Sequence, residues 1–146
     1  MKKLLFAVLC IGGFLSSCAN ISKDSEPTAA IELNRIDVHT YSNTNEIHTI
    51  HLHLDLDVNF ENHTIYGVAR HEMNPHTCDT AVFDIKGLAI NKVTLGKGKE
   101  KATEYVIGEN NELLGQSLAV KIAENTKYIN IYYQTTENTE ALDWLK

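Results

Sequence analysis

The sequence is poor in cysteine, in clustered basic residues and in long hydrophobic runs, and each shortage excludes a class of protein. It has three cysteines in 146 residues, and two of them fall near the N-terminus, so Cys78 has no partner for an internal disulfide. The net charge is −6 without basic clusters, which disfavours nucleic acid as a partner. The apolar run from Leu4 to Phe14, about eleven residues, is too short for a membrane-spanning helix.

The N-terminal residues have instead the order of a bacterial export signal. Lys2 and Lys3 precede the apolar run, and small residues follow it up to the tetrapeptide LSSC, which ends at Cys18. This tetrapeptide resembles the lipobox, whose cysteine is diacylated and becomes the first residue of the mature protein. We therefore predict a lipoprotein signal peptide at residues 1–17, lipidation of Cys18, and a lipid anchor in the bacterial cell envelope, on its periplasmic or surface face. An ordinary signal peptide with a chance cysteine is the alternative.

Removal of this signal leaves 129 residues of the 146, enough for one domain with a modest core. Residues 18–30 are polar, contain Pro27 and show no period, so we predict a flexible tether there. Residues 31–146 then form the domain.

A period of two runs through His48–Phe60 and predicts a long strand with one buried face. Thr64–Met73 continues the alternation with an inward set of Ile65, Gly67, Ala69, His71 and Met73. The even positions of the first strand, expected to face the core, are His48, Ile50, Leu52, Leu54, Leu56, Val58 and Phe60.

Shorter strands follow, separated by turn signals such as Lys86-Gly87 and Gly96-Lys97-Gly98. No segment of ten residues or more shows a helical stripe, and no internal repeat is present. This pattern predicts an all-β fold, an antiparallel β-sandwich or a large antiparallel sheet. The expected strands are Thr80–Ile85, Leu88–Leu95, Glu104–Ile107, Leu118–Ile122 and Tyr128–Gln134.

The heptapeptide HLHLDLD at residues 51–57 places His51, His53, Asp55 and Asp57 at alternate positions. Imidazoles and carboxylates are zinc ligands, and two histidines at this spacing can share a metal. The polar face of a half-buried strand has the same spacing, and it explains all four residues without a metal. We therefore expect a solvated face here and assign no metal ligand in the chain.

The stretch His71-Glu72-Met73-Asn74-Pro75-His76 begins like the H-E-x-x-H signature of zinc metallopeptidases. That signature needs histidines four residues apart on one helical face. Proline occupies the fourth position here, and it disfavours helix at the residue before it. The stretch is therefore expected to be a strand, with His71 on its mainly apolar face.

Three further features have plainer explanations. Cys78 lies two residues after His76, but without an orienting group for a thiolate and its base it is expected to be inert. Gly96-Lys97-Gly98-Lys99 lacks the spacing of a phosphate-binding P-loop and predicts a hairpin turn. The aromatic residues are expected in core or edge packing and not in a binding platform; they are Tyr128, Tyr132, Tyr133 and Trp144.

The order of several segments resembles the N-terminal domain of the M1 zinc aminopeptidases, most closely the leukotriene-A(4) hydrolase branch. Each motif alone is weak, but their order and spacing over residues 37–145 are specific. The segments are DVHTYS at 37–42, TIHLHLDL at 49–56, TIYGVA at 64–69, VFDIKGLAI at 82–90 and ALDWL at 141–145.

The resemblance implies a saddle-like antiparallel β domain that packs on a thermolysin-like catalytic domain and helps to shape the peptide site. The family's zinc signature H-E-x-x-H and its G-x-M-E-N loop are not found in these 146 residues, so no catalytic residue, cofactor or zinc ligand is carried over. The family's domain continues beyond the match that includes Trp144, so we expect residues 31–146 to be cut short at their C-terminal end.

Two functions follow as hypotheses. The first is the non-catalytic β domain of an M1-type zinc aminopeptidase, anchored through lipid on Cys18, inactive alone and able to pair with a separately encoded catalytic part. The second is a free-standing β-sandwich lipoprotein that acts as a binding or scaffold module. A metal-dependent enzyme using His51 and His53 is a third and weaker possibility.

Overall fold

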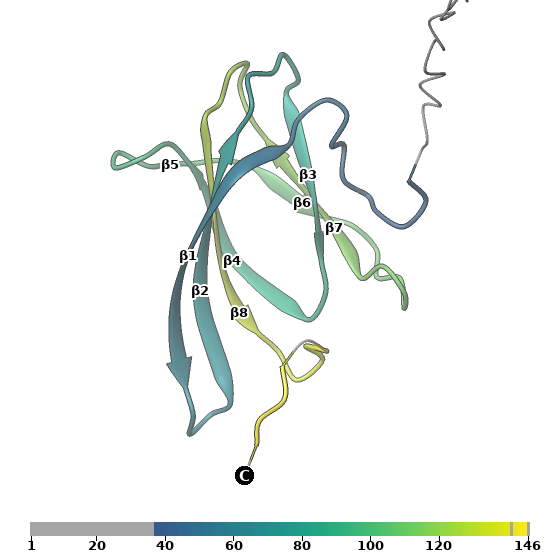
Figure 1. Cartoon of the computed structure of the whole chain (residues 1–146), viewed down its shortest axis with the longest axis vertical. Helices are drawn as coiled ribbons and strands as arrows, with labels where there is room; N and C mark the ends of the chain where they lie inside the picture. Colours follow the sequence, from purple (N-terminus) through teal and green to yellow (C-terminus); the bar gives the residue numbers. More distant parts are fainter. Residues whose placement is uncertain (1–36, 141, 146) are drawn as a thin grey trace, which may run out of the picture. The chain divides into compact units, whose positions relative to one another are not determined.

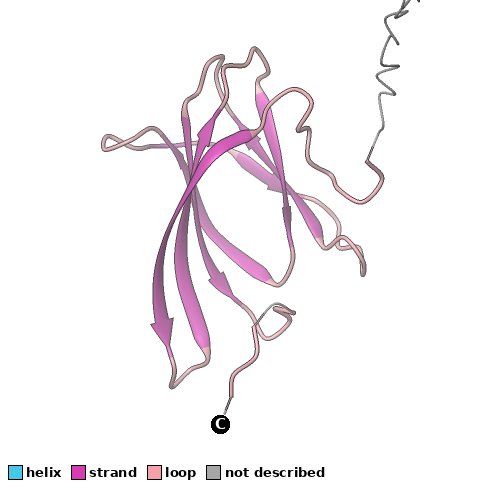
Figure 2. Ribbon diagram, in the orientation of Figure 1, coloured by secondary structure: helices cyan, strands magenta, loops and turns pink. Residues whose placement is uncertain are grey.

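Antiparallel strands form all the regular secondary structure of residues 37–140 and 142–145, the part of the chain that the computed structural model describes (Figure 2). This range contains no helix, and hence none that could cross a membrane. The predicted signal peptide, Cys18 and the tether at 18–30 lie outside the described residues. The strands are β1 (Thr49–Asn59), β2 (Thr64–Met73), β3 (Thr80–Ile85), β4 (Leu88–Leu95), β5 (Lys101–Ala102), β6 (Tyr105–Ile107), β7 (Gln116–Lys121) and β8 (Tyr128–Thr135).

The all-β prediction is confirmed, and the strands form two sheets. One sheet has five strands in the order β1-β2-β8-β4-β5, and the other has three in the order β3-β7-β6. All neighbouring strands are antiparallel. In Figure 1 the lower parts of β1 and β2 extend below the β3–β4 turn. The smaller sheet therefore covers only part of the larger one.

The strand predictions agree closely with this structure. The bounds of β2, β3 and β4 are those expected from the alternation, while β6 and β7 are each shifted by one or two residues. β5 was not expected, because its two residues are too few to show a period. Its pairing with Thr94 and Leu95 of β4 is set by the turn at Gly96–Gly98, where both glycines have positive φ.

A bulge near the start of β1 reverses the alternation that the sequence suggested. The register passes from Thr49 opposite Met73 to His51 opposite Glu72, so one extra residue is inserted. Before the bulge the odd positions face the core: Ile47 is buried, and the Thr49 hydroxyl lies 2.9 Å from Nδ1 of His71. The expectation that His48 and Ile50 face the core is therefore wrong, because sequence alone does not reveal the extra residue.

After the bulge the predicted face is right, but its predicted burial is wrong. One row across the larger sheet consists of Val93, Ile131, Ala69 and Leu54. Val93 is 1% exposed and Ile131 is 5% exposed, whereas Leu54 at the β1 end is 49% exposed. The even-numbered residues of β1 from Leu52 to Val58 thus share the core-facing side of the sheet but are not covered. The buried core consists of Ile47, Met73, Ala81, Ile85, Val93, Leu118, Val120, Ile122, Ile129 and Ile131.

The opposite face of the larger sheet has a polar cluster at its centre. Asn130 is fully buried; it accepts a 2.8 Å hydrogen bond from Nε of Arg70 and donates a 2.9 Å bond to the Gly96 carbonyl. Glu100 accepts hydrogen bonds from Thr94 and Tyr132, at 2.6 and 2.7 Å. The Thr94 bond is the largest cause of a lowered pKa for Glu100. The cluster fixes the β4–β5 hairpin against β8.

Gly87, between β3 and β4, lets the chain turn where the backbone is crowded. Its φ is +66°, and a Cβ there would lie 2.6 Å from the Asn138 carbonyl oxygen. Its own carbonyl accepts bonds from the backbone and hydroxyl of Thr136, both at 3.0 Å, and from the hydroxyl of Thr139. The turn thus holds the segment that follows β8.

We expect Gly87→Ala to be much more destabilising than Gly98→Ala. Both glycines have positive φ, but nothing lies within 4 Å of a Cβ at Gly98. The Gly98 change should lower the free energy of unfolding by about 1 kcal/mol, the cost of left-handed backbone. The Gly87 change adds a clash with backbone and should lower it by roughly 3 kcal/mol. Urea unfolding of residues 31–146 measures both, and equal losses would contradict this account of the turn.

Candidate functional site

The most unusual surface of the domain is the core-facing side of β1, which we call the open face and define as Leu52, Leu54, Leu56 and Val58. Their exposed fractions range from 41% for Val58 to 49% for Leu54. They lie opposite His71, Ala69, Gly67 and Ile65 of β2. A row of large apolar side chains exposed on one strand is typical of an interaction surface.

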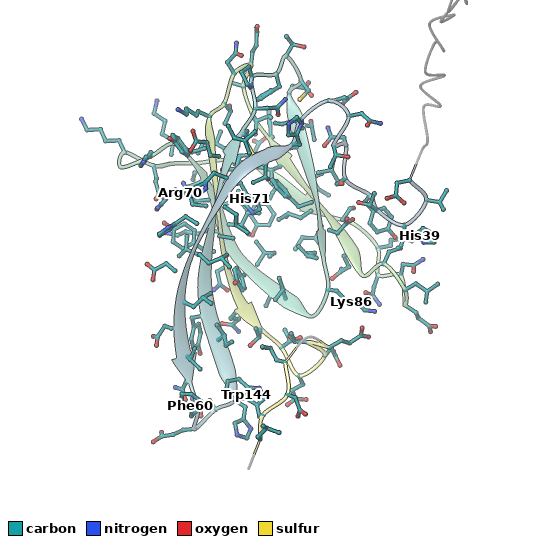
Figure 3. All side chains as sticks on the ribbon, in the orientation of Figure 1. His39, Phe60, Arg70, His71, Lys86 and Trp144 are labelled. Carbon is teal, nitrogen blue, oxygen red and sulfur yellow. The ribbon has the colours of Figure 1, made fainter. Side chains whose placement is uncertain are left out.

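Aromatic side chains flank the lower end of this strand. Phe60 and Trp144 meet edge to face with ring centroids 5.9 Å apart, and His63 stacks on Trp144 at 5.1 Å. Figure 3 shows Phe60 and Trp144 near each other there. Next to them is a cleft of about 590 Å³, lined in part by His63, Thr135 and Trp144. The sequence did not reveal this cluster, because its members come from the β1–β2 turn and from the chain after β8.

The metal candidates of residues 51–57 lie on the other face of β1. Histidine and aspartate alternate with the open-face leucines, and all four polar side chains are exposed. Within residues 37–140 and 142–145, no group of three or more His, Cys, Asp or Glu side chains is placed to hold a metal ion. The arrangement is the solvated strand face that the alternation predicts.

His71 and His76 are not arranged as in a metallopeptidase signature. His71 lies in β2 on the core-facing side, where its ring packs against Phe83 with centroids 4.7 Å apart. His76 follows β2 in a loop and is 5% exposed. Its Nε2 lies 3.1 Å from the Thr126 carbonyl oxygen and its Nδ1 lies 3.2 Å from the Cys78 carbonyl oxygen. The His76 ring therefore links two loops.

The structure also brings Cys78 to the same imidazole. Its Sγ lies 3.5 Å from Nδ1 of His76, and the Thr126 carbonyl at Nε2 is an orienting group that the sequence did not reveal. Cys78 itself is partly buried against the core. Its inertness stays a prediction.

The lysine-glycine turn and the tyrosines do not combine into a binding site. Gly96–Lys99 is a hairpin turn between β4 and β5, as predicted. Tyr132 donates to Glu100 and lies under the Lys92 ammonium at 4.0 Å from the ring centroid. Tyr133 is on the opposite side of β8 and packs over Gly67. The tyrosines thus do not share one surface.

Comparison with solved structures identifies the fold. The structure of yeast LTA4 hydrolase in complex with bestatin matches with a TM-score of 0.63 and 24% identity over 71% of this chain and 17% of that chain. Native leukotriene A4 hydrolase from Saccharomyces cerevisiae matches with a TM-score of 0.60 and 24% identity over 69% of this chain and 17% of that chain. The chain therefore spans about a sixth of the length of these enzymes. No protein-family model and no curated protein sequence matched.

The burial of His71 makes the domain sensitive to acid. Burial lowers the pKa of His71 from 6.5 to about 4, so below pH 6.5 the unfolded chain binds a proton that the folded chain does not. Stability is thus undiminished above pH 6.5 and falls as the pH decreases towards 4. Between pH 7.5 and 5 we expect a loss of about 2 kcal/mol from this group.

His71→Leu should remove that part of the pH dependence, because leucine does not titrate and the exposed Thr49 hydroxyl can bond to water. Urea unfolding at pH 7.5 and 5 measures it. His39→Leu, at an exposed position before β1, is the control. An unchanged pH dependence in His71→Leu would contradict the assignment.

Proposed function

We propose that this chain, which has the fold of the N-terminal domain of leukotriene A4 hydrolase, is the non-catalytic N-terminal domain of an M1-type zinc aminopeptidase, anchored to the cell envelope by lipid on Cys18. Its role is structural: it packs on a zinc-containing catalytic domain that lies outside these 146 residues and helps to form the entrance to the peptide site. No residue of the chain is assigned to catalysis or to zinc.

The open face of β1 is the observation that carries this proposal. A domain that works alone buries its large apolar side chains or scatters them, whereas Leu52, Leu54, Leu56 and Val58 form one row that continues the core-facing side of the sheet. A second domain seated there would extend the core over β1. Phe60, just after this strand, and Trp144, which contacts it, are further apolar side chains near its end.

The chemistry of the described residues fits a supporting role. They place no metal-binding group of three, and the 146 residues contain neither H-E-x-x-H nor G-x-M-E-N. Hydrolysis of amino-terminal peptide bonds therefore depends on the partner domain. In this arrangement the β domain contributes surface and rigidity, and the partner supplies the zinc and its ligands.

The alternative is a free-standing β-sandwich lipoprotein that acts as a binding or scaffold module. This alternative is favoured by the hydrophobic core, which the described residues form among themselves. Leu118, Val120 and Ile129 are fully buried in it. Such a module would fold cooperatively as a monomer without a catalytic partner. Coding DNA downstream separates the two functions: an in-frame or one-base-shifted continuation with G-x-M-E-N and H-E-x-x-H supports the aminopeptidase domain, and an unrelated neighbour supports the module.

Charge on the open face should prevent assembly with the catalytic domain. We expect Leu54→Asp/Leu56→Asp to abolish co-purification of a protein that contains H-E-x-x-H, together with its aminopeptidase activity. Val106→Asp/Ile107→Asp is the matched control, since both residues are exposed but lie in β6 of the smaller sheet. Loss of partner and activity in both variants, or in neither, would count against the open face as the contact.

Cys18 should be needed for the membrane anchor. With labelled fatty acid in the medium, we expect the wild-type chain to take up label and to sediment with membranes. Cys18→Ala should take up none and should keep residues 1–17, which a mass measurement detects. Cys10→Ala is the control. Equal labelling of wild type and Cys18→Ala would refute lipidation at this residue.

A further inference from the structure

The free edge of β1 is a separate feature from its open face. β1 is the outermost strand of the five-stranded sheet and, among the described strands, pairs only with β2. Over its eleven residues it presents a row of backbone N–H and C=O groups that no other strand of residues 37–140 and 142–145 covers. Such an edge is a template for a further strand, and natural proteins usually protect it with charge, proline or a cover.

The hydrogen bonds of β2 show which residues of β1 face this edge. Ile65 donates its backbone N–H to Oγ1 of Thr135 in β8, at 2.9 Å, so its N–H points away from β1. Val58, which is opposite Ile65, then points away from β2, because opposite residues of an antiparallel pair either face each other or both face outward. By alternation, the same holds for the leucines of the open face, Leu52, Leu54 and Leu56.

The sequence of this edge is complementary to itself when it is reversed. In HLHLDLD, an antiparallel pairing of two copies centred on Leu54 places His53 opposite Asp55 of the second copy. The same pairing places His51 opposite Asp57 and Leu52 opposite Leu56. Shifting the centre to Leu52 puts histidine opposite histidine, and shifting it to Leu56 puts aspartate opposite aspartate. Among centres on the edge-facing leucines, only Leu54 gives every histidine an aspartate.

The backbone geometry favours the same centre. The edge-facing leucines would exchange hydrogen bonds between copies, and the His–Asp pairs would occupy the positions between them. Those are the non-hydrogen-bonded pairs, in which the Cα atoms are about 4.5 Å apart and the side chains are closest. The charges would therefore meet at the positions where cross-strand ion pairs are strongest.

The charged side chains concerned are available for this contact. All four are exposed, and among the ion pairs of the described residues none involves Asp55 or Asp57. On β2, Glu72 faces His51 and Arg70 faces His53. Glu72 is paired with Lys127 at 3.1 Å, and Arg70 with Glu100 at 3.6 Å. The nearest charges of β2 are thus already partnered within the chain.

We propose that two copies of this chain form a two-fold symmetric dimer through the β1 edges, centred on Leu54, in which each five-stranded sheet continues into the other. The contact is isologous, so it closes at two copies and leaves no free β1 edge. This inference is independent of the proposed function: the dimer uses the edge of β1, whereas the catalytic domain would use its open face.

Charge reversal tests the pairing while every apolar residue is kept. The full chain is studied by sedimentation velocity in density-matched non-ionic detergent at pH 6.5. The all-acidic variant His51→Asp/His53→Asp places aspartate opposite aspartate, and its dimer dissociation constant should rise at least about tenfold. The swapped variant, His51→Asp/His53→Asp/Asp55→His/Asp57→His, has the wild-type composition and is again self-complementary, so it should dimerise like the wild type.

Mixing gives a second and more specific readout. The all-histidine variant Asp55→His/Asp57→His should not dimerise alone, but together with the all-acidic variant it should form a heterodimer, because the mixture restores His–Asp pairs at every position. Thermal unfolding of each variant verifies that the exposed substitutions leave the domain folded. If the swapped variant did not fold, the mixture would still decide the question.

Other outcomes overturn the dimer. A wild-type chain that stays monomeric to 100 µM would overturn the proposal, because the β1 edge would then be covered by another strand or left free. If the wild-type and all-acidic chains associated equally, the association would arise from the N-terminal residues or from the open face.

Discussion

Incomplete coverage of the larger sheet by the smaller one is the constraint on which the rest of the molecule depends. Three strands cannot cover five, and β3, β7 and β6 bury the side chains of β4 and β8 while leaving β1 open. Along one row the environment changes from Val93 at 1% exposure to Leu54 at 49%. Apolar side chains on one face of one sheet therefore have two roles: those near β4 hold the domain together, and those on β1 are available for contacts.

The covered part of the domain explains how β1 remains ordered while it contributes little to the core. Its start is fixed by buried Ile47 and by the Thr49–His71 contact beside Phe83. Beyond the bulge, its known strand partner is β2 alone, and β2 is held by β8. On the far side of β8, the Asn130 cluster fixes the β4–β5 hairpin. Burial of Asn130 is tolerated because its side chain both accepts and donates a hydrogen bond.

The sequence predicted what depends on neighbouring residues and missed what depends on distant ones. The alternation in Thr64–Met73 and Leu88–Leu95 was enough to place both strands correctly, and Pro75 was enough to reject a helical zinc signature. The bulge at Thr49–His51 is set by pairing with β2, and the exposure of Leu54 is set by the width of a sheet formed far away in the chain. The Phe60–Trp144 contact joins residues that lie far apart in the sequence. None of these leaves a local signal.

Residues 51–57 show how one pattern can have several physical meanings. As a list of side chains, two histidines and two aspartates suggest a metal site, but a strand keeps successive side chains of one face about 6.5 Å apart at the backbone, and no third ligand group is placed with them among the described residues. If the segment is a half-buried strand, the leucines should be buried in the core and the charged side chains should face solvent. The structure confirms which side chains share each face, but the leucines are exposed. Neither a solvated face nor a metal requires the order of the charges, histidines first and aspartates second. The order makes the strand complementary to its own reverse, and the free edge of β1 is where the proposed dimer uses it.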